Sequence, residues 1–181
     1  MPPLSVLMPC YNVAATLHAT LESLATQTFV DFEIVAVDDG STDATVDLLE
    51  TWANSEPRLR LMRCPHLGII EALNAGLAEC RAPLVARMDA DDLAHPRRFE
   101  LQLDYMQQNP DLGLVACLVK GFPEEDLREG FRNYIAWLNS LVADEEIKGE
   151  RFVESPLAHP SVVFRKDIIR EAGGYQEHGW P

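Results

Sequence analysis

The sequence predicts an α/β fold of three layers, in which a mostly parallel sheet lies between two layers of helices. Three observations support this prediction. Short apolar runs alternate with segments of helical periodicity through most of the chain. Most of these runs are apolar throughout, which is typical of parallel strands buried on both faces. Polar and acidic residues directly follow several of the runs, and this is where α/β sheets place their ligand sites.

The first half of the chain predicts alternating strands and helices. Each expected strand is a short apolar run, and each expected helix has apolar residues three or four positions apart. Thr42 or Asp43 is expected to cap the second helix by accepting hydrogen bonds from its free N–H groups. In order, the elements are a strand at 4–8 that ends at Pro9, a helix through Leu17, Leu21 and Leu24, a strand at 32–37, a helix through Val46, Leu49 and Trp52, a strand at 58–62, a helix through Ile70, Leu73 and Leu77, and a strand at 84–88.

The second half continues this alternation. Pro96 suits the first turn of a helix, because it lacks the N–H group that a first turn leaves unpaired. Another helix is expected between 127 and 142. It either packs on the sheet or lines an acceptor site with Phe131, Tyr134 and Trp137. The remaining expected elements are a helix through Phe99, Leu103 and Met106, strands at 112–117 and 161–164, and a helix at 165–172 that stops at Gly173 and Gly174.

Composition and charge limit the possible functions. The 181 residues carry 15 Lys plus Arg and 29 Asp plus Glu, which gives a formal net charge of −14. A surface this acidic repels phosphate backbones, so nucleic acid is not an expected partner. We expect no signal peptide and no transmembrane segment, because the sequence has no basic leader and no apolar run of about 20 residues. The expected location is the cytoplasm, with peripheral contact at a membrane as an open alternative.

Three polar segments, 9–12, 38–43 and 88–92, directly follow expected strands. Because the carboxyl ends of parallel strands share one edge of the sheet, we expect these segments to open on one side of the molecule. The first of them, Pro-Cys-Tyr-Asn, contains no glycine, which excludes the glycine-rich turn of a dinucleotide fold. The sequence has no Walker phosphate loop either. A phosphate bound at this edge therefore needs positive charge from another source.

Segment 88–92 gathers Asp89, Asp91 and Asp92 at the end of a buried strand. Two carboxylates 4 Å apart repel by about 4 kcal/mol at an effective dielectric constant near 20. A divalent cation reverses this repulsion, and Mn²⁺ and Mg²⁺ bind one or two carboxylates together with phosphate oxygens and water. In extended chain Asp89 and Asp91 point to the same side, so one can bind metal while the other reaches a ribose hydroxyl. We therefore predict a Mn²⁺ or Mg²⁺ site for the diphosphate of a nucleotide sugar.

Other interpretations of the acidic segments explain less of the pattern. A calcium loop needs an oxygen ligand where Leu93 stands and a glycine where Ala94 stands. A phosphatase with an attacking aspartate needs Thr or Val at the position of Leu93. Asp92 alone remains an alternative cap for the next helix, and segment 38–43 is rich in turn formers. Asp39 is the candidate for a nucleobase contact, because a carboxylate accepts the imide N–H of a pyrimidine.

Several segments together resemble the inverting glycosyltransferases of family 2, which have the GT-A nucleotide-sugar fold. The resemblance implies one catalytic domain over 1–181. Residues 1–118 would form its nucleotide-sugar-binding half, and residues 119–181 an incomplete acceptor-side half. The segments that carry the resemblance are 5–12, 37–43, 68–76 and 88–92, followed by 159–165 and 172–175.

The resemblance implies roles for the matching positions near the base. Pro9 and Tyr11 would line the nucleobase pocket, with Tyr11 stacking or packing against the base. Asp39 would bond the edge of the base. Asn74 would lie near the nucleotide, and a buried structural amide is its alternative.

The resemblance also implies roles for the acids. Asp89 would approach the ribose or the diphosphate and stand beside Asp91 as a metal ligand. Asp91 would bind the metal, and Asp92 would tune the site from behind these ligands. His159 is a candidate of lower rank, because a single His before Pro is more often structural.

The implied reaction transfers a sugar from a nucleotide-diphosphate sugar, with UDP as the expected nucleotide, to an acceptor hydroxyl with inversion. The acceptor is a carbohydrate or a lipid-linked molecule that the sequence does not specify. The family's acidic base motif is expected beyond Pro181, and Glu177 has the surroundings of ordinary loop surface. We therefore expect nucleotide binding with poor sugar transfer. A sugar nucleotidyltransferase and a non-catalytic nucleotide-binding module are the alternatives.

Overall fold

The computed structural model describes residues 1–150 and 152–177 and confirms the α/β architecture. Its six-stranded sheet has the order β3-β2-β1-β4-β6-β5. The first four of these strands are parallel to one another, whereas β6 is antiparallel to both of its neighbours. The strands are β1 (Leu4–Cys10), β2 (Phe32–Asp38), β3 (Leu59–Arg63), β4 (Leu84–Arg87), β5 (Leu114–Ala116) and β6 (Val162–Arg165).

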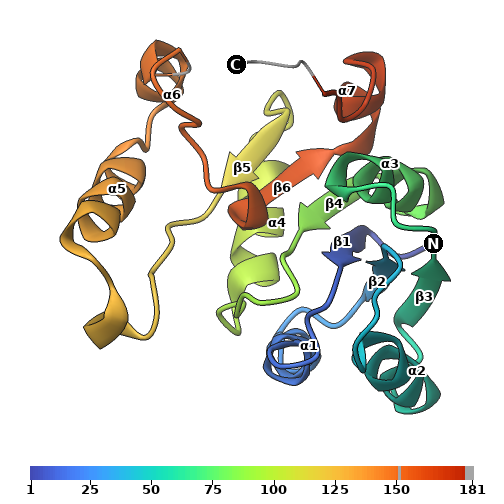
Figure 1. Ribbon diagram of the computed structural model, residues 1–181. Coiled ribbons are helices and arrows are strands. Elements are labelled where there is room, and N and C mark those ends of the chain that lie inside the picture. The colour runs from blue at the N-terminus through green and yellow to red at the C-terminus, as the bar shows by residue number, and fades with distance from the viewer. Residues whose placement is uncertain (151, 178–181) are drawn as a thin grey trace.

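Helices cover both faces of the sheet, so the predicted three layers are present (Figure 1). Helices α1, α2 and α4 pack on one face, and α3 and α7 pack on the other. None of the described helices is both long and apolar enough to cross a bilayer. The α-helices are α1 (Leu17–Ala25), α2 (Thr45–Ser55), α3 (Ile69–Glu79), α4 (Arg98–Gln108), α5 (Glu129–Ser140), α6 (Asp144–Glu150) and α7 (Lys166–Glu171), with short 3-10 turns at Glu124–Asp126 and His159–Ser161.

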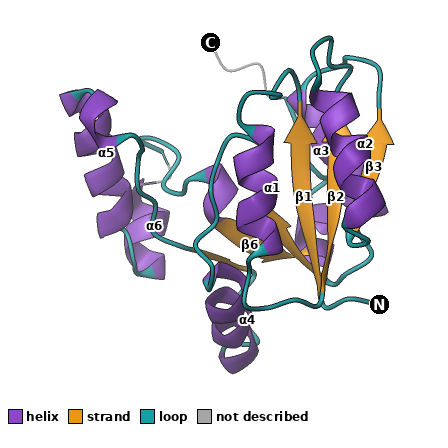
Figure 2. Ribbon diagram, turned by 90° about the horizontal axis from the view of Figure 1, so that it is seen from below, coloured by secondary structure: helices purple, strands orange, loops and turns teal. Residues whose placement is uncertain are grey.

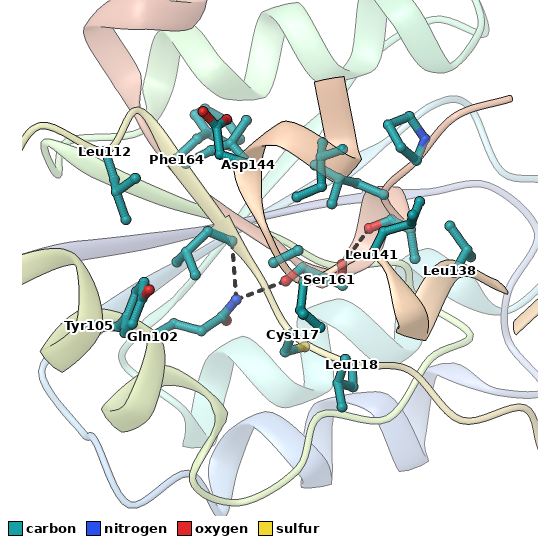
Figure 3. A pocket seen from close by; sticks show the side chains of 18 of the residues that line it. Gln102, Tyr105, Leu112, Cys117, Leu118, Leu138, Leu141, Asp144, Ser161 and Phe164 are labelled. Carbon is teal, nitrogen blue, oxygen red and sulfur yellow. Dashed lines mark hydrogen bonds between the residues drawn. The ribbon is translucent and has the colours of Figure 1, made fainter. Parts of the chain in front are cut away.

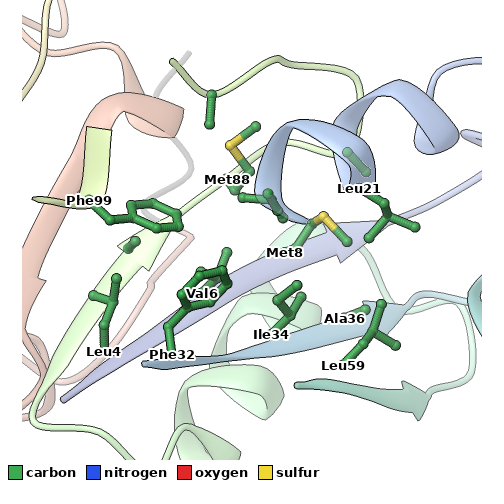
Figure 4. Packing of buried hydrophobic residues seen from close by; sticks show 14 of the residues in the cluster. Leu4, Val6, Met8, Leu21, Phe32, Ile34, Ala36, Leu59, Met88 and Phe99 are labelled. Atoms are coloured by element: carbon green, nitrogen blue, oxygen red, sulfur yellow. The ribbon is translucent and has the colours of Figure 1, made fainter. Parts of the chain in front are cut away.

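The core has two parts because the central strands are buried on both faces. On the α1 side, Met8 and Phe32 pack with Phe99 of α4, and the two phenyl rings meet edge to face at 5.2 Å (Figure 4). On the α3 side, Leu7 and Val37 belong to the second cluster. The alternation of side chains along a strand sends neighbouring residues of β1 into opposite clusters.

The first strand is longer than predicted and contains Pro9. It pairs with β2 through Cys10 but with β4 only as far as Leu7. Pro9 therefore lies where β1 has no ladder on its β4 side, and a residue without an N–H group is tolerated there. Helix α4 starts later than predicted, at Arg98, so Pro96 precedes its first turn. Asp92 consequently does not cap this helix, which excludes the alternative role left open for it.

The segment after β5 departs from the prediction more strongly. The helix expected between 127 and 142 is present as α5, but Leu138 is its only buried residue. Helices α5 and α6 stand beyond the β5 edge rather than on a face of the sheet (Figure 1 and Figure 2). They are separated from the edge by an apolar cavity of about 960 Å³. Helix α6 was not anticipated, because its sequence is almost entirely polar.

Hydrogen bonds join polar groups in the wall of the cavity beside β5 (Figure 3). The Gln102 amide donates to the carbonyl of Ser161 at 2.8 Å, and the Ser161 hydroxyl donates to the carbonyl of Ala158 at 2.6 Å. From α5 the lining residues are Leu138 and Asn139. Phe131, Tyr134 and Trp137 were expected to line an acceptor site. Within the part of the chain that the structure describes, they do not line this cavity.

Candidate functional site

The loops after β1, β2 and β4 meet at the carboxyl edge of the sheet, as predicted. Cys10 pairs with Asp38, and Leu7 pairs with Arg87, so the three strands end close together. Asn12 joins the first two loops: its backbone N–H donates to Ser41 Oγ at 3.0 Å, and its Oδ1 accepts from the N–H of Thr42 at 2.8 Å. Asn12 has a φ of 52°, a left-handed conformation that Asn adopts more readily than most residues.

The acidic loop after β4 is fixed to helix α1. The carbonyl of Ala90 accepts hydrogen bonds from Thr20 Oγ1 at 2.9 Å and from Thr16 Oγ1 at 3.2 Å. In the second loop, Asp43 accepts from the N–H and the hydroxyl of Thr45, which supports a structural role for that acid. The site is therefore built on loops that are tied to one another and to the helices behind them.

Asp39 lies at the edge of one ring of a stacked pair. The rings of Tyr11 and His66 are 4.2 Å apart with an angle of 11° between their planes. His66 Nδ1 lies 2.9 Å from Asp39 Oδ2, and the backbone N–H groups of Leu67 and Gly68 donate to the same carboxylate at 2.9 and 3.0 Å. Asp39 is 4% exposed, whereas Tyr11 is 44% exposed. The Asp39 carboxylate is thus held rigidly beside the two stacked rings, and the Tyr11 ring is partly exposed to solvent.

Asp89 has a cationic partner that the sequence analysis did not foresee. The guanidinium of Arg87, which is 2% exposed, pairs with the Asp89 carboxylate. Among the described residues, Nε of Arg87 has no hydrogen-bond partner. A buried arginine costs free energy unless it is paired, so the Asp89 contact compensates both charges. Part of the repulsion within the acidic loop is therefore relieved by the protein itself.

Of the remaining acids, Asp92 is repelled by its neighbours more than nearby arginines attract it. Asp91 is exposed, and Asp92 is half-buried. Burial raises the pKa of Asp92, and the neighbouring carboxylates of Asp89 and Asp91 raise it further. Burial also raises the pKa of the Cys10 thiol, with the charges of Asp38 and Asp89 acting in the same direction. Negative potential is thus concentrated where the three loops meet.

This carboxyl edge suits a divalent cation that takes few protein ligands. Within the described residues, no three His, Cys, Asp or Glu groups are arranged to surround a metal ion. Mg²⁺ and Mn²⁺ are commonly held by one or two carboxylates together with water and substrate phosphates. The exposed Asp91 beside Asp89, together with the raised pKa of Asp92, fits such a sparse site.

Two other predicted residues have structural surroundings. Pro9 is buried within β1 rather than in the turn after it. The Asn74 side chain donates to the carbonyl of Tyr175 and accepts from its N–H, both at 2.9 Å. These bonds match the structural alternative for Asn74. His159 packs against the ring of Tyr175 at 5.5 Å, and Glu177, considered as a substitute base, is exposed.

His66 and Arg87 were missed by the sequence analysis, although each had a signal. The third strand ends at the same edge as the others, so the loop that carries His66 belonged with the three selected segments. Arg87 lies within an apolar run that was assigned to a buried strand. A charged residue in such a strand indicates a partner nearby.

Comparisons with known proteins agree with this architecture. The sequence model of glycosyl transferase family 2 matches residues 5–173. The amylovoran biosynthesis glycosyltransferase AmsE of Erwinia amylovora is 38% identical over 178 residues, covering 96% of this chain and 64% of AmsE. An Escherichia coli UDP-Gal:alpha-D-GlcNAc-diphosphoundecaprenol beta-1,3-galactosyltransferase is 29% identical, covering 96% of this chain and 62% of the relative. The chain thus spans less than two thirds of the length of these relatives.

Solved structures with the same fold extend this similarity. S. aureus TarS 1-349 in complex with UDP-GlcNAc superposes with a TM-score of 0.75 at 21% identity, covering 96% of this chain and 48% of TarS 1-349. The mannosyltransferase PcManGT from Pyrobaculum calidifontis, in complex with GDP-Man and Mn2+, gives a TM-score of 0.72 at 23% identity, covering 96% of this chain and 47% of PcManGT. The family match, the 38% identical relative and the shared fold lead to one assignment: the chain belongs to glycosyl transferase family 2.

Proposed function

We propose that this chain binds a nucleotide-diphosphate sugar, with UDP as its nucleotide, and serves the transfer of that sugar to an acceptor hydroxyl with inversion. The observation that carries the proposal is the meeting of Tyr11, Asp39 and the acidic 88–92 loop at one edge of the sheet. A base requires an aromatic face and a fixed hydrogen-bond acceptor, and a metal-bound diphosphate requires an acidic loop. Family membership supports transfer rather than the nucleotidyl transfer considered as an alternative.

The proposed base site uses Pro9, Tyr11 and Asp39. Tyr11 is half exposed and would offer its ring for stacking, and Asp39 would accept the imide N–H of uracil. The hydrogen bonds from Leu67 and Gly68 hold the Asp39 carboxylate in place. Because this acceptor is rigid, little conformational freedom is lost when a base binds. Asn74 stays a predicted neighbour of the nucleotide, although its amide already bonds Tyr175.

The proposed diphosphate site uses the acids after β4. Asp91, with Asp89 beside it, would hold Mn²⁺ or Mg²⁺, and the cation would supply Lewis-acid stabilisation of the departing diphosphate. Arg87 orients Asp89 from below, and Asp92 tunes the charge behind both. The Ala90 carbonyl, bonded to two threonines of the α1 region, keeps this loop from swinging away from the edge.

The proposed acceptor is a carbohydrate or a lipid-linked sugar. The names of two relatives support this class, because one is an amylovoran biosynthesis glycosyltransferase and the other is named for a diphosphoundecaprenol-linked sugar. Cytoplasmic location with peripheral membrane contact would suit such an acceptor. The acceptor hydroxyl attacks the anomeric carbon from the face opposite the diphosphate, which inverts that centre.

Calorimetric titration with UDP, GDP and dTDP, each with and without Mn²⁺, tests the proposal. We expect UDP to bind in a Mn²⁺-dependent manner and Asp91→Asn to weaken that binding at least about tenfold, since a metal ligand is lost. Asp111→Asn is the matched control, because Asp111 is an exposed acid before β5, at the opposite edge of the sheet. Binding that ignores Mn²⁺, or is indifferent to Asp91→Asn, would contradict the proposal and favour a non-catalytic nucleotide-binding module.

A further inference from the structure

His66 occupies the space between Tyr11 and Asp39. Its imidazole is stacked on the Tyr11 ring at 4.2 Å, nearly parallel to it. The same imidazole reaches the Asp39 carboxylate with Nδ1 at 2.9 Å from Oδ2. One planar ring therefore makes an aromatic contact and a carboxylate contact at the same time.

The hydrogen-bond pattern identifies the hydrogen on this ring. His66 Nδ1 also lies 3.0 Å from the backbone carbonyl oxygen of Asp39. A carbonyl oxygen and an ionised carboxylate only accept hydrogen bonds, so Nδ1 must carry the hydrogen that it shares with them. The imidazole thus presents an N–H group to Asp39 while one of its faces covers Tyr11. These are the contacts that the proposed function assigns to the nucleobase.

A base and the imidazole cannot make these contacts together. Oδ2 of Asp39 already accepts the Gly68 N–H and the imidazole N–H, which uses both of its acceptor sites, so a second ring N–H cannot share that oxygen. A ring that stacks on Tyr11 and donates to Asp39 has to enter the position that His66 holds. The alternative, a base on the other face of Tyr11, would lie away from Asp39 and lose that hydrogen bond.

We infer that His66 is an internal competitor of the nucleobase: its ring fills the base position, and a nucleotide binds by displacing it. The inference rests on the proposed function, because it takes the base to contact Tyr11 and Asp39. His66 then lowers the affinity for every base, and the Asp39 carboxylate selects among the bases. Uracil, thymine and guanine carry a ring N–H that replaces the imidazole N–H at Asp39. Cytosine and adenine present a ring nitrogen acceptor there, which the carboxylate repels.

Displacement of the ring leaves the rest of the site intact. The His66 side chain is 55% exposed, so it can rotate into solvent. The backbone on its carboxyl side stays anchored, because Leu67 and Gly68 bond the Asp39 carboxylate independently of the imidazole. On the other side, Gly40 lets the backbone of His66 approach closely: a Cβ at Gly40 would lie 2.8 Å from His66 N. The loop is therefore held by its main chain while its side chain is free to leave.

The energetic consequence is a lowered affinity for nucleotide. When a ligand needs a position that is mostly filled, its apparent affinity falls by the fraction of molecules in which the position is open. Removing the imidazole abolishes one aromatic contact and one hydrogen bond that the ligand would otherwise have to break. We expect His66→Ala to tighten UDP binding by about 5- to 150-fold, the range that corresponds to these two contacts. His66→Phe keeps the stacking surface without the N–H, so its gain is smaller.

Titration calorimetry of the wild-type chain, His66→Ala and His66→Phe with UDP, CDP and pyrophosphate, all with Mn²⁺, tests the inference. Tighter UDP binding by His66→Ala, with pyrophosphate binding unchanged, supports displacement of the ring by the base. His18→Ala is the matched control, because His18 also contacts an aromatic ring, Trp52, and a carboxylate, Glu22, outside the proposed site. NMR provides a second measurement: the His66 ring signals should move on addition of UDP but not of pyrophosphate.

The two proposals fail in different ways. If UDP binding depends on Mn²⁺ and on Asp91 but is unchanged or weaker in His66→Ala, His66 is not a competitor and the donor site stands. CDP binding as tight as UDP binding would likewise overturn the selection of the base. If the wild-type chain binds no nucleoside diphosphate in a Mn²⁺-dependent manner, the proposed function is wrong and the inference falls with it.

Discussion

The amide of Asn74 is paired with the backbone of Tyr175 by two hydrogen bonds of 2.9 Å, one donated and one accepted. This pair joins the middle of α3 to the segment after α7, 101 residues further along the chain. Gly174, next to it, leaves no room for a side chain, because a Cβ there would lie 2.7 Å from Asn74 Oδ1. The pair therefore fixes where the chain runs after α7.

Asn74→Ala should lower the free energy of unfolding by about 2 kcal/mol, because both Tyr175 backbone groups lose their partner. Urea denaturation measures this change. Asn109→Ala is the control, since its amide makes one exposed bond to Tyr105, and we expect a change within about 0.5 kcal/mol. UDP affinity distinguishes the two roles of Asn74, because unchanged affinity in Asn74→Ala would support the structural alternative. A loss of affinity without loss of stability would instead support the predicted place of Asn74 beside the nucleotide.

Glu33 should make stability depend on pH at the amino end of β2. Burial acts to raise the pKa of Glu33, but hydrogen bonds from Ser5, the Arg81 N–H and Arg60 outweigh it and lower the pKa below 4.5. A lowered folded-state pKa adds stability that is present above pH 4.5 and is lost as pH falls through the folded pKa.

Glu33→Gln should therefore reduce the free energy of unfolding by about 2 kcal/mol at pH 7, with a shrinking difference from wild type below pH 4.5. Denaturation curves between pH 3 and pH 7 measure it. A difference that is constant over this range would mean that Glu33 does not titrate with folding.

Gly76 should tolerate no side chain, because a Cβ there would collide with Leu7 and Val37 of the sheet. We expect Gly76→Ala to destabilise the chain by about 1–3 kcal/mol through overpacking. Gly130→Ala in α5 is the matched control, because nothing lies within 4 Å of its added Cβ. Helix propensity should make that control neutral or stabilising by up to about 1 kcal/mol. Equal thermal midpoints for the two variants would contradict the close packing of α3.

Arg87 should oppose cation binding while it holds Asp89. Replacing it with Met removes a positive charge next to the proposed metal ligands, so the Mn²⁺ concentration that half-saturates UDP binding should fall about tenfold. Titrating Mn²⁺ at fixed UDP measures this. Arg63→Met is the control, because Arg63 ends β3 at the same edge but pairs with Glu50. An unchanged Mn²⁺ requirement in Arg87→Met would show that Arg87 does not act on the cation.

Local pattern predicted the six strands and most of the helices along the chain. Apolar runs marked the strands, helical spacing marked the helices between them, and the topology of parallel sheets indicated which edge holds the site. The antiparallel strand β6 was expected as a strand, but its insertion between β4 and β5 was not anticipated. That pairing depends on contacts between Val163 and residues far away in the sequence, such as Ala86, and four residues of apolar sequence do not specify a partner.

The part of the candidate site that depends only on residue type and sequence position could be predicted. Asp89, Asp91 and Asp92 are neighbours in sequence, so their clustering needed no structure. The stacking of His66 on Tyr11 and the pairing of Asn74 with Tyr175 depend on how distant loops pack. Such contacts leave no periodic trace in the sequence. The position of α5 escaped prediction for a related reason, since its apolar side faces a cavity instead of the sheet.

The strand order also determines how long β5 lacks its neighbouring strand during synthesis. Strands β1 to β4 can assemble once the ribosome has released the first part of the chain, but β5 has β6 as its neighbour in the sheet, and β6 starts about 45 residues after β5 ends. At about 5–20 residues per second, β5 waits roughly 2–9 s for its partner. During this interval an unpaired apolar edge is presented to other nascent chains. A chaperone that shields residues near 114–116 would therefore improve the yield of folded protein.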